Sequence, residues 1–177
     1  ILIALGLSVG FKANVWNIGA EGQYIMGAIF GASFALSLYP LESIVIFPAM
    51  ILIGVIGGCL WSMIPAFLKV KFQVNEILVS LMLVYVAEQI LALASLGFLR
   101  NPDGAGFPGS RNLNQYTSAS NAEIIAGTGI HLGVLLSLLM VIFFYVLLFR
   151  HSLGFKIKLL GNSPKASGFS GDNPNKL

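Results

Sequence analysis

A cluster of polar side chains interrupts two apolar runs near the start of the chain. The stretch from Asn14 to Gln23 contains a second asparagine, Asn17, together with Glu21 and two glycines. Polar side chains and irregular backbone at membrane depth are tolerated where they are buried in protein or line a watery cavity, and broken helices of this kind form binding sites in many transporters. The alternative is an ordinary cytoplasmic turn with Glu21 at a helix N-terminus, where the helix dipole favours a carboxylate. The residue types alone leave both interpretations open.

A second polar group lies in and before the apolar run 74–98. Asn75 has the residue type of a helix N-cap and Glu76 that of a first-turn acid, which is the ordinary interpretation of both. Glu88 lies near the middle of the run, with Tyr85 one turn before it. A carboxylate at mid-bilayer is costly and usually faces the bundle interior or a cavity. The alternative is a protonated Glu88 that is hydrogen-bonded within the bundle.

Signatures of enzymatic chemistry are missing. The sequence has no phosphate-binding Gly-x-x-x-x-Gly-Lys loop and no His-Glu-x-x-His motif. One cysteine, Cys59, lies inside an apolar run, and the topology below places His131 and His151 at opposite membrane faces, so no metal site is expected. No Ser/His/Asp set can be proposed. We therefore expect no catalytic residue, no metal and no cofactor in this chain.

The composition indicates a membrane protein. Apolar residues make up 56% of the 177 residues and charged residues 10%, against about 25% in an ordinary soluble domain. The mean hydropathy is +0.87. This balance excludes disorder, a nucleic-acid-binding domain and most soluble folds. The expected fold class is all-α, a polytopic transmembrane helical bundle, and because the chain starts inside an apolar stretch we interpret it as a fragment of a larger protein.

Five apolar runs define the expected helices. At 1.5 Å per residue the last four cover roughly 27–38 Å, enough for a hydrocarbon core of about 30 Å, whereas the first resembles the end of a truncated helix. Their continuity favours helices over the alternating segments of a membrane barrel. The expected spans are about 1–11 (truncated), 22–39, 44–68, 74–98 and 132–149.

The basic residues predict the orientation. If the basic turn 69–73 is cytoplasmic, alternation also places the Lys12 region and the segment 150–177 in the cytoplasm, and it makes 99–131 an external loop. The cytoplasmic side then has eight basic residues and the outer side has two, Arg100 and Arg111. The same rule explains the basic residues of 150–177 better than a nucleic-acid patch does. The eight are Lys12, Lys69, Lys71, Arg150, Lys156, Lys158, Lys165 and Lys176.

Small residues predict where helices approach closely. Glycines spaced four apart let helix backbones come together in lipid, where no hydrophobic force drives association. Chance in a glycine-rich membrane protein would account for about one of three such pairs. The three pairs are Gly6/Gly10, Gly27/Gly31 and Gly54/Gly58.

Three motifs, in order along the chain, resemble those of a known family. The chain resembles the permeases of ABC transporters, in the branch that takes up nucleosides and simple sugars and is related to the ribose and branched-chain amino acid permeases. One departure is Val84, where that family usually has asparagine. The motifs are Asn17-Ile18-Gly19-Ala20-Glu21-Gly22-Gln23; Val74-Asn75-Glu76-Ile77 with Leu81-Met82-Leu83-x-Tyr85; and Gly154-Phe155-Lys156-Ile157-Lys158 with Gly161-Asn162-Ser163-Pro164-Lys165-Ala166.

The resemblance implies a multi-pass permease of the cell (inner, cytoplasmic) membrane that works with other proteins. Its expected partners are cytoplasmic ATPase subunits, a second identical or homologous permease subunit, an external substrate-binding protein and the lipid bilayer, but no nucleic acid. The candidate pathway residues are Asn17, Glu21, Gln23, Asn75, Glu76, Tyr85 and Glu88. The candidate ATPase-coupling residues are Gly161, Asn162, Pro164, Ala166, Ser167 and Gly171.

Two expectations complete the interpretation. A short cytoplasmic coupling helix should begin near Ser163 and Pro164, because serine can cap a helix and proline suits its first turn. The alternative there is a flexible cytoplasmic loop. The alternative function is an ion-coupled secondary transporter or channel subunit, in which Glu21 and Glu88 would be proton or cation sites.

Overall fold

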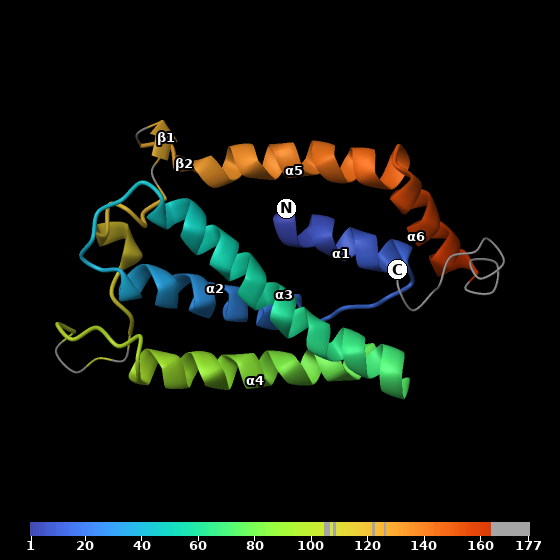
Figure 1. Ribbon diagram of the computed structural model, residues 1–177, viewed down its shortest axis with the longest axis horizontal. Coiled ribbons are helices and arrows are strands. Elements are labelled where there is room, and N and C mark those ends of the chain that lie inside the picture. Colours follow the sequence, from blue (N-terminus) through green and yellow to red (C-terminus); the bar gives the residue numbers. More distant parts are fainter. Residues whose placement is uncertain (105–106, 108, 122, 126, 164–177) are drawn as a thin grey trace. The chain divides into compact units, whose positions relative to one another are not determined.

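Helices joined by short connections, and by one long loop, make up most of the chain (Figure 1). The structure, a computed structural model, describes residues 1–163 apart from 105, 106, 108, 122 and 126. Within these residues the elements are α1 (Leu2–Lys12), α2 (Ala20–Ser37), α3 (Ile46–Phe72), α4 (Glu76–Leu96), η1 (Leu113–Gln115), β1 (Glu123–Ile125), β2 (Ile130–His131), α5 (Leu132–Phe149) and α6 (Ser152–Asn162). They belong to two units: one consists of Ile1–Asn17 and Glu123–Leu177, the other of Ile18–Ala122.

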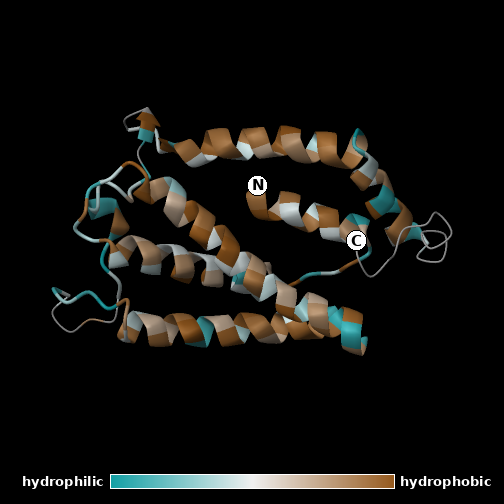
Figure 2. Cartoon of the chain, in the orientation of Figure 1, coloured by the Kyte–Doolittle hydropathy of each residue, from teal (hydrophilic) through white to brown (hydrophobic). Residues whose placement is uncertain are grey.

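The helical fold class is confirmed, and three of the described helices are long and apolar enough to cross a membrane. These are α3, α4 and α5, which are largely brown in Figure 2. Four complete spans were predicted. The fourth corresponds to α2, which is not long and apolar enough to be counted as a membrane-crossing helix. Its first turn contains Glu21 and Gln23, and small residues follow, so it is less apolar than its neighbours. A complete span at 22–39 stays a prediction.

Within the second unit, α2 packs against both α3 and α4. The main buried cluster joins Met26 and Ile29 of α2 to Ala87 and Ala94 of α4, with Leu99 beyond the end of α4. The buried side chains are small or medium-sized, so the helices approach closely. The exposed outer faces of α3 and α4 are rich in Leu, Ile, Val and Phe, which is typical of helices that face lipid.

Two of the three predicted glycine pairs lie at the crossing of α2 and α3. A Cβ atom added to Gly27 would lie 2.9 Å from the carbonyl oxygen of Gly54, and one added to Gly58 would lie 3.2 Å from that of Gln23. The two backbones therefore touch, as the spacing predicted. Among the described residues the Gly6/Gly10 pair makes no contact between helices, because a Cβ atom at Gly6 would meet nothing within 4 Å and one at Gly10 would lie only near the Val15 carbonyl oxygen, at 3.2 Å.

The predicted basic turn 69–73 is wrong in its extent, because α3 continues to Phe72. Lys69 and Lys71 occupy the last helical turn, where basic side chains interact favourably with the free carbonyl groups of the helix end. Gln73 makes the turn itself by adopting the left-handed conformation, with φ of 55°. The connection to α4 is therefore only Gln73, Val74 and Asn75.

The first part of the long loop folds back onto the connection between α2 and α3. The Tyr116 hydroxyl donates a hydrogen bond to the carbonyl oxygen of Leu41, and the Ser43 N–H donates to Ser118 Oγ at 3.0 Å. Arg111 lies over the Tyr39 ring, 4.2 Å from its centroid. The predicted loop 99–131 therefore has a defined structure in this part, and it also contains η1 and the two short strands, which were not predicted.

The first unit contains α1, α5 and α6, and α6 is a helix that the sequence analysis missed. A helix was expected to begin near Ser163, but α6 ends there: Ser163 is its C-terminal cap residue. The N-terminal cap of α6 is His151, whose Nδ1 accepts a hydrogen bond from the Leu153 N–H at 3.1 Å. The helix predicted from Pro164 onward lies outside the described residues.

Candidate functional site

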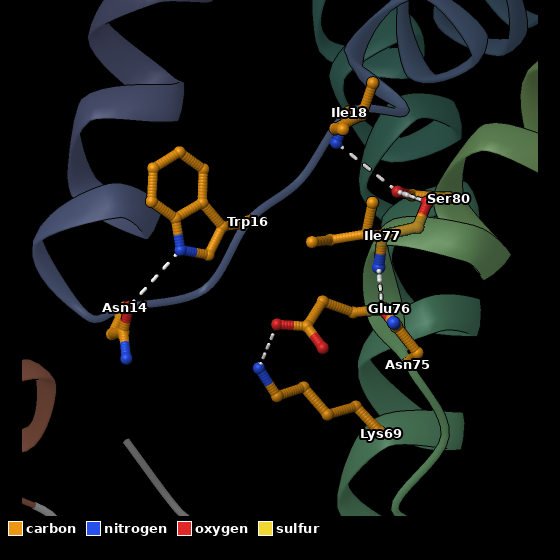
Figure 3. Close-up of polar contacts among 8 residues, drawn as sticks. All are labelled: Asn14, Trp16, Ile18, Lys69, Asn75, Glu76, Ile77 and Ser80. Carbon is orange, nitrogen blue, oxygen red and sulfur yellow. Dashed lines mark hydrogen bonds and ion pairs between the residues drawn. The ribbon is translucent and has the colours of Figure 1, made fainter.

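The polar motif is seated on the first turns of α4 by its backbone (Figure 3). The Ile18 N–H donates a hydrogen bond to Ser80 Oγ at 3.3 Å, and Ser80 Oγ donates in turn to the Ile77 carbonyl oxygen at 3.1 Å. A Cβ atom added to Gly19 would lie 2.7 Å from the Ser80 carbonyl oxygen. Only glycine permits this approach, so Gly19 brings the segment that precedes α2 directly onto the α4 backbone.

Gly22 makes the next contact, where three helices meet. A Cβ atom there would lie 3.1 Å from Val84 Cα on α4 and 3.3 Å from Trp61 Nε1 on α3. The Trp61 indole N–H is buried and has no hydrogen-bond partner among the described residues. A buried indole N–H usually finds an acceptor, so the Trp61 N–H is an unusual feature of this junction.

Val84 is 7% exposed and faces Gly22. The sequence analysis named it as a departure from the family pattern. In this structure the position lies in the packed contact between α2 and α4. The side chain at position 84 therefore belongs to the helix packing beside the motif.

The polar side chains of the motif differ in exposure: one is exposed, one is half-buried and one lines a groove. Glu21 is exposed in the first turn of α2, which favours a carboxylate, and Asn17 is half-buried at the end of the segment that precedes Ile18. Gln23 is half-buried and lines a groove of 520 Å³ between α2 and α3. The wall of this groove is formed mainly by small or apolar residues: Tyr24, Gly27, Ala28, Gly31, Ala32, Met50, Ile51, Gly54, Val55 and Leu113.

Asn75 and Glu76 have the roles that their residue types predicted, a helix N-cap and a first-turn acid. Asn75 caps α4, since its Oδ1 accepts a hydrogen bond from the Ile77 N–H at 3.0 Å. Glu76 lies in the first turn and forms an ion pair with Lys69 at the end of α3 (Figure 3). The side chains of Lys69 and Glu76 are only 34% and 17% exposed. Together these contacts fix the corner between α3 and α4.

Tyr85 and Glu88 lie on an exposed face of α4, away from the residues that pack against α2. The buried face consists of Ser80, Val84, Ala87 and Ala94, whereas Tyr85 is 63% exposed and Glu88 is also exposed. Among the described residues Glu88 has no hydrogen-bond or ion-pair partner. The structure therefore does not show the alternative of a Glu88 that is hydrogen-bonded within this part of the bundle.

Two of the expected ATPase-coupling residues are described. Gly161 packs against the backbone of Lys12 and Ala13 at the end of α1, so closely that a Cβ atom would collide with the Lys12 carbonyl oxygen. Asn162 is exposed at the end of α6. Pro164, Ala166, Ser167 and Gly171 lie outside the described residues.

Ser80 and Trp61 complete the site, and the sequence analysis named neither. Each lies inside an apolar run, where serine is a common helix-packing residue and tryptophan an ordinary core or interface residue. Their roles arise from contacts with residues about 40 to 60 positions away, which no local pattern contains. No group of three or more His, Cys, Asp or Glu side chains in the described part of the chain could hold a metal ion.

These features define a multi-pass helical membrane protein with a polar motif packed by glycines at a helix junction. The chain belongs to the family described as the branched-chain amino acid transport system / permease component, whose model matches residues 1–177. This is a family of membrane transport components rather than of enzymes. The resemblance stated from the three motifs is thereby confirmed.

Three relatives from different organisms show where in the family the chain lies. It is 31% identical to the glucose ABC transporter permease protein TsgB13 of Haloferax volcanii, over 97% of this chain and 47% of that protein. It is 25% identical to the nucleoside ABC transporter permease protein NupB of Lactococcus lactis and 25% identical to the guanosine ABC transporter permease protein NupP of Bacillus subtilis, over 97% of this chain in both cases and 48% and 49% of those proteins. The chain thus spans about half the length of these relatives. No solved structure matches it.

Proposed function

We propose that this chain is the membrane-spanning permease part of an ATP-driven ABC importer for nucleosides or simple sugars. The observation that carries the proposal is the packing of the motif Ile18–Gln23 onto α4, in a chain of a transport permease family. Glycines at 19 and 22 hold the motif against Ser80 and Val84, and leave the Glu21 side chain exposed. A fixed backbone with a free polar side chain is suited to bind a polar substrate during passage.

The chemistry of the motif suits a neutral, hydroxyl-rich substrate. A carboxylate accepts hydrogen bonds and a side-chain amide both donates and accepts, so Glu21 and Gln23 can pair with sugar hydroxyl groups. The three relatives carry names that refer to glucose, nucleosides and guanosine. Nucleosides and simple sugars share hydroxyl-bearing rings, and this is the substrate class that we assign.

The remaining candidate residues extend the proposal. Asn17 supports the motif from the preceding segment, while Asn75 and Glu76 hold the α3–α4 corner and so position α4 beneath the motif. Tyr85 and Glu88 provide a second polar face on α4. Because a carboxylate on a membrane helix requires protein or water around it, this face lines the pathway or meets another subunit.

The proposed partners follow from the family. Two cytoplasmic ATPase subunits supply the energy, an external substrate-binding protein delivers the substrate to the 99–131 side, and a second permease subunit, identical or homologous, completes the pathway. The segment 150–177 is proposed to contact the ATPase through Asn162, Pro164, Ala166, Ser167 and Gly171, and Gly161 fastens this segment to the end of α1.

Uptake should depend on ATP hydrolysis by the partner subunit. In proteoliposomes containing the complete transporter, radiolabelled guanosine or glucose should accumulate only with ATP and the binding protein. Replacement of the catalytic glutamate of the ATPase by glutamine should reduce uptake to background. A protonophore should leave initial rates unchanged. Uptake that survives the ATPase variant and collapses with the protonophore would instead establish the ion-coupled alternative.

Labelling should reveal the proposed orientation. In a Cys59→Ala background, an impermeant thiol reagent added to intact cells should modify Gly109→Cys but not Lys71→Cys. Both positions suit the test, because a Cβ atom at Gly109 would meet nothing within 4 Å and Lys71 is exposed. Permeabilised cells provide the control, since both variants should then react. Labelling of Lys71→Cys in intact cells would contradict the orientation.

A further inference from the structure

Two lysines of the first unit converge on one aromatic ring. Lys12 Nζ, at the end of α1, lies 5.2 Å from the centroid of the Phe149 ring, and Lys158 Nζ, in α6, lies 5.8 Å from the same centroid. An aromatic face attracts a cation but does not neutralise it. Neither lysine forms an ion pair within the part of the chain that the structure describes. The two positive charges are therefore uncompensated there.

The lysines border a recess of 470 Å³. Its lining consists of Ser8, Phe11, Lys12, Lys158 and Asn162. The Ser8 hydroxyl donates to the Leu5 carbonyl oxygen at 2.7 Å, so its proton is already used. The groups that remain to donate to a ligand are the two ammonium groups and the amide N–H groups of Asn162, which is exposed. The charged residues in this lining are both cations, so the recess favours an anion.

The packing of α6 on α1 fixes the shape of this recess. Gly161 lies so close to the Lys12 carbonyl oxygen that no side chain fits between them. Lys158 and Asn162 therefore lie beside the end of α1, although they are far from it in sequence. The recess is a product of the fold, because no short stretch of sequence contains its lining.

The position of Phe149 indicates the kind of anion. Phe149 is the last residue of α5, one of the three helices that can span the membrane, so its ring marks the boundary of the hydrocarbon region. We therefore expect the two ammonium groups, 5.2 and 5.8 Å from that ring, at the depth of lipid phosphates. Phe11 and Phe155 are 46% and 67% exposed, which provides apolar surface for acyl chains.

We propose that Lys12 and Lys158 bind the phosphate of an anionic phospholipid headgroup in this recess, which Asn162 borders, at the junction of α1, α5 and α6. Basic pockets between membrane helices recognise such headgroups by charge and hydrogen bonding. The bound lipid would join the end of α1 to α6, the helix that leads into the proposed coupling segment. This site requires no assumption about the transported substrate.

Lipid binding can be measured on the purified transporter in detergent by native mass spectrometry. Phosphatidylglycerol should bind more tightly than phosphatidylcholine of the same chain length. Each basic side chain near a membrane surface contributes about fivefold in affinity, so Lys12→Gln with Lys158→Gln should weaken phosphatidylglycerol binding about 30-fold. The double arginine variant, Lys12→Arg with Lys158→Arg, should retain most of the binding because both charges remain.

Lys71→Gln is the matched control. Lys71 also lies over aromatic rings, 5.3 Å from the Phe67 centroid and 5.7 Å from the Phe72 centroid, but it does not line the recess. Its replacement should leave the preference for phosphatidylglycerol unchanged. If the double glutamine variant does not fold, Asn162→Asp serves instead, because it places a negative charge at an exposed position of the recess; it should weaken binding at least fivefold.

Four outcomes would overturn the proposal. The first is equal binding of the two lipids by the parent protein. The second is an equal loss of binding in Lys71→Gln, which would reveal a general basic surface. The third is displacement of the lipid by millimolar inorganic phosphate, which would reveal a site for soluble anions. The fourth is loss of ATPase co-purification in the lysine variants with lipid binding intact, which would make the recess a protein-docking surface.

Discussion

Glu21→Ala is expected to reduce uptake by about 10- to 150-fold. This range corresponds to the loss of one hydrogen-bonding interaction of a charged group, about 1.5–3 kcal/mol. Glu21 is exposed in the first turn of α2, on a segment whose backbone is held by Ser80 and Gly22. Alanine favours helix formation, and the lost interaction with the helix dipole is worth only about 0.3–1 kcal/mol. The effect on transport should therefore exceed the effect on folding.

The measurement is the initial rate of uptake at matched amounts of membrane-inserted protein. Co-purification of the ATPase should be unchanged, because Glu21 is remote in sequence from the coupling segment. Glu42→Ala is the control, since Glu42 is an exposed carboxylate in the connection at the other end of α2. It should transport at the parent rate. Normal uptake by Glu21→Ala would establish that the motif is an ordinary turn with a first-turn acid.

The position of the motif could be predicted from the local sequence, but the residues that hold it could not. Its polarity between apolar runs indicated a break between helices, and α1 does end at Lys12 while α2 begins at Ala20. What holds the motif was not predictable, because Ser80 and Trp61 contact it from α4 and α3. Such contacts depend on which faces of two helices meet, and the apolar runs that contain these residues are similar on every side.

Helix ends were predictable where the local sequence alone determines them. The predicted span 132–149 agrees with α5, because apolar residues fill it without interruption and Arg150 follows directly. The end of α3 was placed four residues too early, since Lys69 and Lys71 were interpreted as a turn. Lysines in a last helical turn are favoured by the helix dipole, so charge alone does not mark the end of a helix.

The missed helix α6 has a different explanation. Its composition is mixed, with Lys156 and Lys158 among apolar residues, and it contains two glycines that disfavour a helix in isolation. Both glycines instead permit close packing: Gly154 against the end of α5 and Gly161 against Lys12. The helix is therefore stabilised by tertiary contacts, and intrinsic preference alone would not predict it.

Gly27→Val should destabilise the α2–α3 pair by about 1–3 kcal/mol, the usual cost of forcing extra atoms into a packed interface. A Cβ atom at Gly27 would lie 2.9 Å from the Gly54 carbonyl oxygen, and valine adds two further methyl groups. The obstacle is backbone, which cannot rotate away as a side chain can, so the two helices must separate. Because α2 also carries the motif, its displacement should shift Gly22 from Val84 and lower uptake.

Thermal unfolding of the detergent-purified protein is the measurement for this variant, and Gly6→Val is the matched control. Gly6 also begins a Gly-x-x-x-Gly pair on an apolar helix, yet a Cβ atom there would meet nothing within 4 Å. Both variants bear the same cost of placing a β-branched residue in a helix, so the difference between their melting temperatures isolates the helix crossing. Equal melting temperatures would mean that the contact between Gly27 and Gly54 contributes nothing to stability, and the small-residue pattern of α2 would then need an explanation other than packing against α3.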